Sequence, residues 1–203
     1  MKGFISEATE ARLRAKPLLV MGIDPGIDRC GVAVVEQIGR AERLLHASCI
    51  ATDREALDGD RLVQLYQDLK TICANFKPDE VAVEELFFAK NVTTAMRVSH
   101  ARGVVLLALA EAKIAFFEYT PMEIKQTLTG SGAAKKPQVA FMAKRRLGLE
   151  RIEGPDDTSD AVAIAVCHLV RRKFGVLTGG GSAGATARYN QALQRAQAMG
   201  GQR

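Results

Sequence analysis

LLVMGIDPGIDRCG, residues 18–31, joins a short apolar run to a Pro-Gly turn and places an acid where the two meet. The run from Leu19 to Ile23 is typical of a buried strand, and Asp24 stands at its end. A carboxylate is costly to bury unless a hydrogen bond, a cation or a metal ion compensates its charge. An aspartate before Pro-Gly is also ordinary turn chemistry, so this stretch alone leaves a catalytic role and a turn role open for Asp24.

Length and composition limit the class of protein. A chain of 203 residues with 47% hydrophobic residues is long enough for one domain with a well-buried core. The longest apolar stretch, 103–110, is far shorter than the roughly 18 residues of a membrane span, and the amino terminus lacks a secretory pattern. The cysteines form no CxxC pair, which argues against zinc or a disulfide framework. We therefore expect a cytoplasmic protein that does not associate with membranes.

The charge indicates a polyanionic partner only weakly. The formal net charge is +5, and many basic proteins bind no nucleic acid. The distribution is more informative, because seven basic residues accompany a single acid between Lys125 and Arg151. A solvated basic face explains such a run equally well.

Hydrophobic periodicity predicts an α/β protein with mixed strand directions. Three strands would form an antiparallel meander, and a helix, a strand, a long helix and another strand would follow before the closing helices. The predicted strands are 19–24, 31–38, 42–51, 81–83 and 114–118, and the helices are 58–76, 92–112, a short one from 121, 137–147 and 157–173.

The domain boundaries follow from composition. We expect residues 1–17 to form an N-terminal extension, 18–175 the domain, and 176–203 a flexible, basic tail rich in Gly and Ala. The second half of the helix 92–112 is apolar nearly all round. This pattern indicates burial on two sides, one against the sheet and the other against a second subunit.

Further acids stand at the ends of predicted elements. Adjacent residues of a strand face opposite sides, so Glu84 and Glu85 cannot both point to one site. At the start of the last helix, Asp160 shares a helix face with Asp157 at a spacing of three and with Asp156 at a spacing of four. Acids at this position also favour the helix dipole, so spacing alone chooses neither the pair nor the role.

Four segments occur together in an order that resembles one nuclease family. IDPG, VAVEELFFAKN, KQTLTGSGAAKKPQV and DDTSDAVAIAVCH, within residues 18–173, resemble the RuvC family of Holliday-junction resolvases. The resemblance implies a ribonuclease-H-like fold with a five-stranded mixed sheet flanked by helices. It also implies a homodimer, metal-dependent paired nicking of four-way junction DNA in recombination and repair, and a branch-migration helicase partner of the RuvA and RuvB type.

The resemblance also assigns roles to residues. It implies that the catalytic, metal-binding acids are Asp24, Glu84, Asp157 and Asp160. It thereby selects Glu84 over Glu85 and Asp157 over Asp156. Hard carboxylate oxygens suit Mg²⁺ or Mn²⁺, and two ions about 4 Å apart would activate the attacking water and stabilise the leaving oxygen. In this hypothesis Asp24 bridges the two ions.

Basic and aromatic positions of the family pattern are also present. Lys125 and Lys136 resemble the basic residues near the scissile strand, although Lys135 beside Lys136 leaves that choice open. Phe87 resembles a base-stacking residue, but a core position is an alternative for it. The residues implied in DNA binding are Phe87, Lys90, Lys125, Lys135 and Lys136.

Other functions fit part of the sequence. A related ribonuclease-H-like nuclease acting on RNA or on another branched substrate would need the same acids. The sugar-kinase and actin-like ATPases also deliver an Asp to a Gly turn, but they need two such domains, which 203 residues cannot hold. A binding protein without catalysis would not need all four acids.

Overall fold

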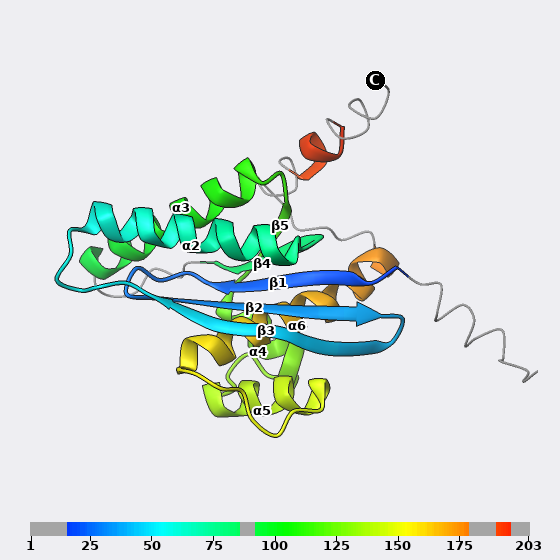
Figure 1. The fold of residues 1–203 in the computed structure, drawn as a ribbon. Helices are drawn as coiled ribbons and strands as arrows, with labels where there is room; N and C mark the ends of the chain where they lie inside the picture. The colour runs from blue at the N-terminus through cyan, green and yellow to red at the C-terminus, as the bar shows by residue number, and fades with distance from the viewer. Residues whose placement is uncertain (1–15, 86–91, 179–189, 196–203) are drawn as a thin grey trace, which may run out of the picture.

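A mixed five-stranded sheet forms the centre of the molecule. The computed structural model describes residues 16–85, 92–178 and 190–195 (Figure 1). The strand order is β3-β2-β1-β4-β5, with β1 to β3 antiparallel and with β4 and β5 parallel to β1. This confirms the predicted meander and mixed sheet. The strands are β1 (Leu18–Asp24), β2 (Arg29–Ile38), β3 (Ala41–Ala51), β4 (Glu80–Glu84) and β5 (Ala115–Tyr119).

Helices cover both faces of this sheet (Figure 1). One face carries α2 (Asp58–Phe76) and α3 (Val92–Glu111), and the other carries α4 (Pro121–Thr129), α5 (Lys136–Leu147) and α6 (Asp156–Thr178). The predicted bounds agree with the structure to within a few residues for most elements. Among the helices of the described ranges, none combines the length and the apolar composition that crossing a membrane requires.

Strand β1 divides its side chains between the two faces. Met21 and Ile23 pack in the cluster below α2 and α3, whereas Val20 packs in the cluster below α6. This alternation is the expected consequence of the strand period of two residues. Because all three side chains are fully buried, β1 is the central strand that both helix layers enclose.

Two glycines allow α6 to lie directly against the sheet. A Cβ atom on Gly22 would stand 2.1 Å from the Ala161 carbonyl oxygen, and one on Gly31 would stand 2.0 Å from the Asp157 carbonyl oxygen. Gly31 is the cross-strand neighbour of Asp24. The contact between α6 and β2 therefore places the first turn of this helix beside the end of β1.

The expected tail contains described residues. Helix α6 continues to Thr178, and residues 190–195 are helical. Asn190 is buried, and its side-chain amide donates to the Phe116 carbonyl (2.7 Å) and accepts from the Phe116 N–H (3.1 Å) on the edge strand β5. The domain boundary at 175 stays a prediction, and the expected extension 1–17 lies outside the described residues except for Lys16 and Pro17.

Gly22→Ala tests the close contact of α6. We expect the free energy of unfolding to fall by about 1–3 kcal/mol, because the new Cβ meets backbone atoms that cannot rotate away. Gly59→Ala is the matched control, since its Cβ would meet nothing within 4 Å and should change stability by less than about 1 kcal/mol. Urea denaturation measures both variants, and equal stabilities would contradict this account of the contact.

Candidate active site

Two acids meet at the carboxyl ends of neighbouring parallel strands. Asp24 ends β1 and Glu84 ends β4, and the residues before them, Ile23 and Val83, are register partners. The two side chains share a hydrogen bond. Glu85, the alternative acid, is exposed. The parallel pairing therefore brings together two carboxylates that are 60 residues apart in the sequence.

Helix α6 adds two further acids to this pair. Asp157 and Asp160 are half-buried, whereas Asp156 is exposed. The negative charges of Asp160 and Asp157 both act on Asp24, and that of Asp160 also acts on Glu84. The three other acids named by the family pattern thus all lie close enough to Asp24 to interact with it.

The cluster is short of positive charge. Burial raises the pKa of Asp24, and the charges of Asp160 and Asp157 raise it further. Burial and the charges of Asp24 and Asp160 raise the pKa of Glu84 in the same way. Lys136 opposes both shifts without cancelling them. Carboxylates held this close bind a proton more tightly than isolated ones, and a cation among them would relieve the repulsion.

Two basic side chains already compensate the acids of α6. The Lys136 Nζ atom lies 2.5 Å from Asp160 Oδ2, and the Arg29 Nε atom lies 2.9 Å from Asp157 Oδ2. Burial lowers the pKa of Lys136, but the hydrogen bond to Asp160 and the negative charges of Asp24 and Glu84 raise it by more. The sequence analysis missed Arg29, because its partner lies 128 residues away on α6 and no local pattern joins them.

The donor set suits a hard divalent cation, although the acids are not arranged around one. Within the described ranges, no three His, Cys, Asp or Glu side chains are close enough together to hold a metal ion. Asp157 Oδ2 is buried and accepts no well-aligned hydrogen bond from that part of the chain. Because Asp157 and Asp160 are paired with Arg29 and Lys136, forming a metal site requires these side chains to change partners.

The other expected DNA-binding residues are not drawn into the acidic cluster. Lys125 is half-buried on α4, and it forms no ion pair with the four acids in the described structure. Lys135 precedes α5, and its backbone N–H donates to Gln138 Oε1 (2.8 Å). Phe87 and Lys90 lie outside the described residues. The family pattern alone therefore carries the expectations for these four residues.

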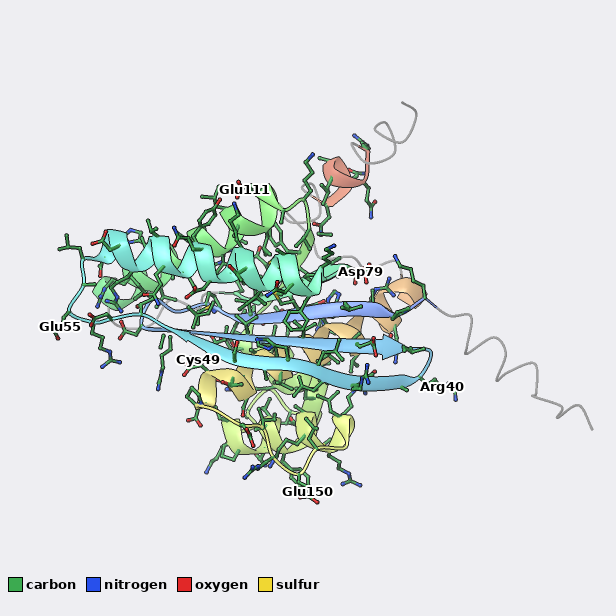
Figure 2. All side chains as sticks on the ribbon, viewed as in Figure 1. Arg40, Cys49, Glu55, Asp79, Glu111 and Glu150 are labelled. Atoms are coloured by element: carbon green, nitrogen blue, oxygen red, sulfur yellow. The ribbon has the colours of Figure 1, made fainter. Side chains whose placement is uncertain are left out.

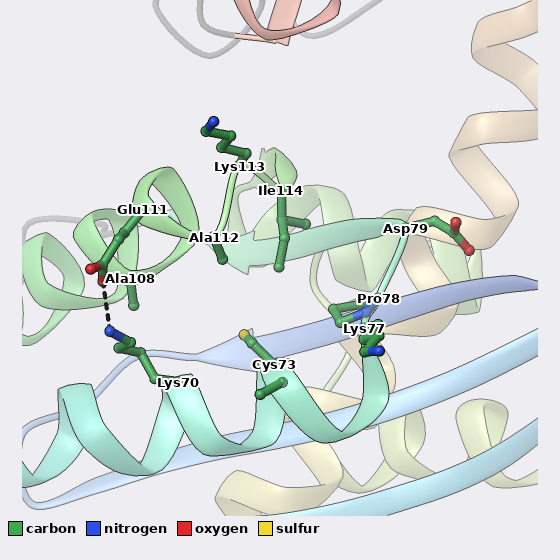
Figure 3. Close-up of a pocket in the computed structure, with 11 residues that line it drawn as sticks. Lys70, Cys73, Lys77, Pro78, Asp79, Ala108, Glu111, Ala112, Lys113 and Ile114 are labelled. Carbon is green, nitrogen blue, oxygen red and sulfur yellow. Dashed lines mark ion pairs between the residues drawn. The ribbon is translucent and has the colours of Figure 1, made fainter. Parts of the chain in front are cut away.

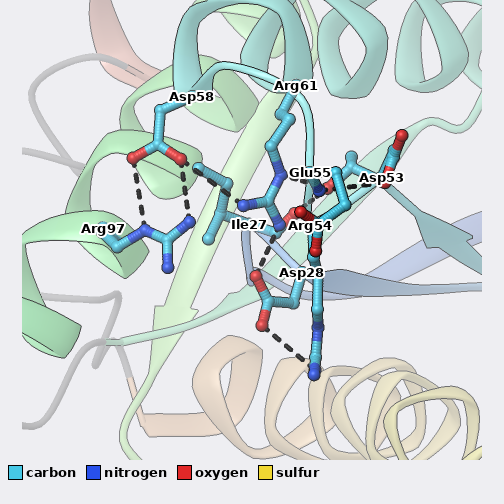
Figure 4. Close-up of polar contacts among 9 residues, drawn as sticks. Ile27, Asp28, Asp53, Arg54, Glu55, Asp58, Arg61 and Arg97 are labelled. Atoms are coloured by element: carbon cyan, nitrogen blue, oxygen red, sulfur yellow. Dashed lines mark hydrogen bonds and ion pairs between the residues drawn. The ribbon is translucent and has the colours of Figure 1, made fainter.

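A second charged network holds the turn that follows Asp24 (Figure 4). The fully buried Arg61 of α2 pairs with Asp28 of this turn (2.5 Å) and donates to Thr52 Oγ1 (2.9 Å). Asp58 in turn accepts two hydrogen bonds from Arg97 of α3, at 2.8 and 3.2 Å. No local pattern in the sequence predicts this network, in which Asp28 anchors the β1–β2 connection.

One cavity of the described structure lies away from the acids. It has a volume of about 690 Å³ and is lined by the ends of α2 and α3, among them Lys70, Cys73 and Lys113 (Figure 3). Asp79, also in its wall, precedes β4, whereas Glu84 ends that strand. Figure 2 places Asp79 near the end of the sheet that carries the Arg40 hairpin, opposite Glu55. The cavity is therefore not part of the acidic site.

Comparisons with known proteins agree on one family. The family model described as crossover junction endodeoxyribonuclease RuvC matches residues 20–168. The enzyme of that name from Desulforamulus reducens is 46% identical over 151 residues, which are 74% of this chain and 93% of the relative. The one from Chloroflexus aggregans is 46% identical over 160 residues, covering 77% and 98%. Nucleases of this family are metal-dependent.

Solved structures support the same assignment. Thermus thermophilus RuvC in complex with a Holliday junction substrate is 36% identical, with a TM-score of 0.73 over 78% of this chain and 96% of that one. The yeast mitochondrial Holliday junction resolvase Ydc2 is 15% identical with a TM-score of 0.53, a likeness of fold only. The expected ribonuclease-H-like fold is thereby confirmed.

Arg61→Ala tests the network behind the Asp24 turn. We expect a loss of about 2–4 kcal/mol in the free energy of unfolding near pH 7, because a buried cation with several partners is removed. Arg54→Ala is the control: Arg54 also pairs with Asp28 but is 71% exposed, so its loss should cost less than about 1 kcal/mol.

The same variants give a pH test. The hydrogen bond from Arg61 lowers the pKa of Asp28 below 3.8 in the folded protein. A lowered folded pKa stabilises the protein above the unfolded value, and the stabilisation is lost as the pH falls through the folded value. The stability difference between wild type and Arg61→Ala should therefore narrow below about pH 4. A difference that stays constant down to pH 2 would contradict this role of Asp28.

Proposed function

Because the chain belongs to the RuvC family of crossover junction endodeoxyribonucleases, we propose that it resolves four-way Holliday junctions by paired, symmetric nicks in DNA recombination and repair. The observation that carries the proposal is the convergence of acids from β1, β4 and α6 in a chain that matches the family over residues 20–168. A metal-dependent nuclease uses such a cluster to hold divalent ions, and these ions offset the negative charge of the phosphodiester so that a nucleophile can approach.

The proposed cofactor is a pair of Mg²⁺ or Mn²⁺ ions. Asp24, Glu84, Asp157 and Asp160 would hold them. When bound, such ions activate the attacking water and stabilise the leaving oxygen. The raised pKa values of Asp24 and Glu84 support this assignment, since burial and the charges of neighbouring acids both disfavour their ionised forms and a bound cation would favour them.

The proposed role of Lys136 is to hold the scissile phosphate. Its Nζ atom already lies among the acids, 2.5 Å from Asp160 Oδ2, and its side chain is 70% exposed. A cation so placed can also stabilise charge that develops in the transition state. Contacts of Lys90, Lys125 and Lys135 with the DNA backbone, and stacking of Phe87 on a junction base, are proposed from the family pattern.

Cutting two strands symmetrically needs two sites, so the proposed active form is a homodimer. Helix α3 supports this with Ala101, Val105 and Leu109 buried against its own chain and Leu107 59% exposed. A helicase partner of the RuvA and RuvB type rests on the family alone. The proposed location is the cytoplasm, with which four free cysteines are compatible.

Asp24→Asn tests the acidic site. We expect nicking of a labelled synthetic four-way junction in Mg²⁺ or Mn²⁺ to fall by about a hundredfold or more, while junction binding in chelator is retained. Asp156→Asn is the matched control, since it removes an exposed acid from the same helix end and should nick normally. Undiminished cleavage by Asp24→Asn, or an equal loss in both variants, would exclude the assignment.

Leu107→Glu tests the dimer. A charge on this exposed apolar position should make the protein monomeric in sedimentation velocity and should convert paired nicks into single, unpaired ones. Phe141→Glu serves as the control for oligomeric state, because Phe141 is 55% exposed on α5, across the sheet from α3. A Leu107→Glu variant that remains a dimer would place the subunit contact elsewhere.

A further inference from the structure

We propose that Arg29 is a further DNA-binding residue of the nuclease site, which Asp157 holds in the free protein and which passes to the substrate phosphate when a divalent ion takes that carboxylate. This inference rests on the proposed function and deepens it. It concerns a residue that neither the sequence analysis nor the family pattern brought into the site.

The backbone of Arg29 is fixed close to the acids. Arg29 is the first residue of β2 and closes the turn that follows Asp24. A Cβ on Gly26 would stand 2.3 Å from the Arg29 carbonyl oxygen, so the turn folds tightly onto this residue. Two residues further on, Gly31 lies under the Asp157 carbonyl. The origin of the Arg29 side chain is therefore set relative to both Asp24 and Asp157.

The guanidinium of Arg29 is less restrained than its backbone. The Arg29 side chain is 52% exposed, and its Nε atom lies 2.9 Å from Asp157 Oδ2. In the described part of the chain, no side chain other than Asp157 pairs with this guanidinium. The two Nη groups of an arginine form the fork that binds two oxygens of one phosphate.

Arg61 shows what a purely structural arginine looks like in this protein. Its side chain is 1% exposed, and three different side chains accept from its Nε, Nη1 and Nη2 atoms (Figure 4). Within the described residues, Arg29 pairs with Asp157 only, and about half of its side-chain surface is exposed to solvent. Arg29 can therefore leave Asp157 for another anion at little cost, whereas the buried Arg61 cannot leave its three partners.

The exchange follows from competition for one carboxylate. A ligand oxygen lies about 2.0–2.1 Å from Mg²⁺, and the oxygen that faces Arg29 is the buried Oδ2 of Asp157. A divalent ion and a guanidinium on the same oxygen repel each other. When the ion occupies Asp157, the Arg29 guanidinium is therefore released. It stays next to the acids, where a scissile phosphate must also lie.

A titration without DNA tests the competition. Mn²⁺ binding to the full chain is followed by calorimetry for wild type, Arg29→Gln and Arg29→Lys. Removing an exposed cation from a carboxylate should tighten Mn²⁺ binding by about two- to fivefold in Arg29→Gln, while Arg29→Lys stays nearer wild type. Arg54→Gln removes a positive charge from the Asp28 turn without touching Asp157, and it should leave the affinity unchanged.

The salt dependence of junction binding tests the released state. Affinity for a labelled four-way junction is measured against salt concentration in Ca²⁺ and in chelator. One phosphate contact contributes about 0.9 to the slope of log K against log salt. In Ca²⁺, the slope for the wild type should be steeper than the slope for Arg29→Gln by about this amount. In chelator, the two slopes should be equal.

The outcomes separate the two proposals. An Mn²⁺ affinity unchanged or weakened in Arg29→Gln, or equal slopes in Ca²⁺, overturns the role of Arg29. A gain in Mn²⁺ affinity equal to that of Arg54→Gln also overturns it, because general charge would then explain the effect. Failure of the wild type to bind or nick the junction in any ion contradicts the proposed function instead, and the DNA-free titration still reports on Arg29.

Discussion

Mutual repulsion among carboxylates is the constraint on which this structure depends. Asp24 and Glu84 share a hydrogen bond at the ends of adjacent parallel strands, with Asp157 and Asp160 close by. A site of this kind is unfavourable in isolation, since each buried charge raises the others' affinity for protons. The fold tolerates it because Arg29 and Lys136 neutralise the α6 acids. In the proposed function the same two basic groups bind the phosphates of the substrate, so the charges that stabilise the free protein would also contribute to the affinity for DNA.

The position of α6 converts this electrostatic arrangement into a defined geometry. Gly22 and Gly31 let the helix backbone lie on β1 and β2, with the Asp157 carbonyl over Gly31. The Arg61 and Asp28 pair holds the turn between the same two strands from the opposite helix layer. The end of β1 is thus restrained by one layer through backbone contact and by the other through charge. The pKa of Asp24 depends on its distance from the neighbouring acids, so a fixed position for the end of β1 keeps that pKa constant.

Much of this could be predicted from the sequence, and what could not has a physical reason. Hydrophobic period is local, so the strands and helices were predicted nearly to their bounds, and the family pattern named acids that do lie near one another. Spacing alone could not separate Glu84 from Glu85, whereas in the structure Glu84 is half-buried and Glu85 is exposed. The pairs of Arg29 with Asp157 and of Arg61 with Asp28 were missed, because they join residues from different elements whose packing no local pattern encodes.

The Asn190 amide on the edge of β5 bears on how copies of the chain can associate. It offers a donor and an acceptor to the Phe116 backbone, as a residue of a neighbouring strand would. An open strand edge invites pairing with another sheet, which leads to uncontrolled aggregation. At Phe116, the backbone N–H and C=O groups already bond to the Asn190 amide of the same chain. Strand β5 therefore cannot pair with a strand of a second molecule at Phe116, although it is an edge of the sheet.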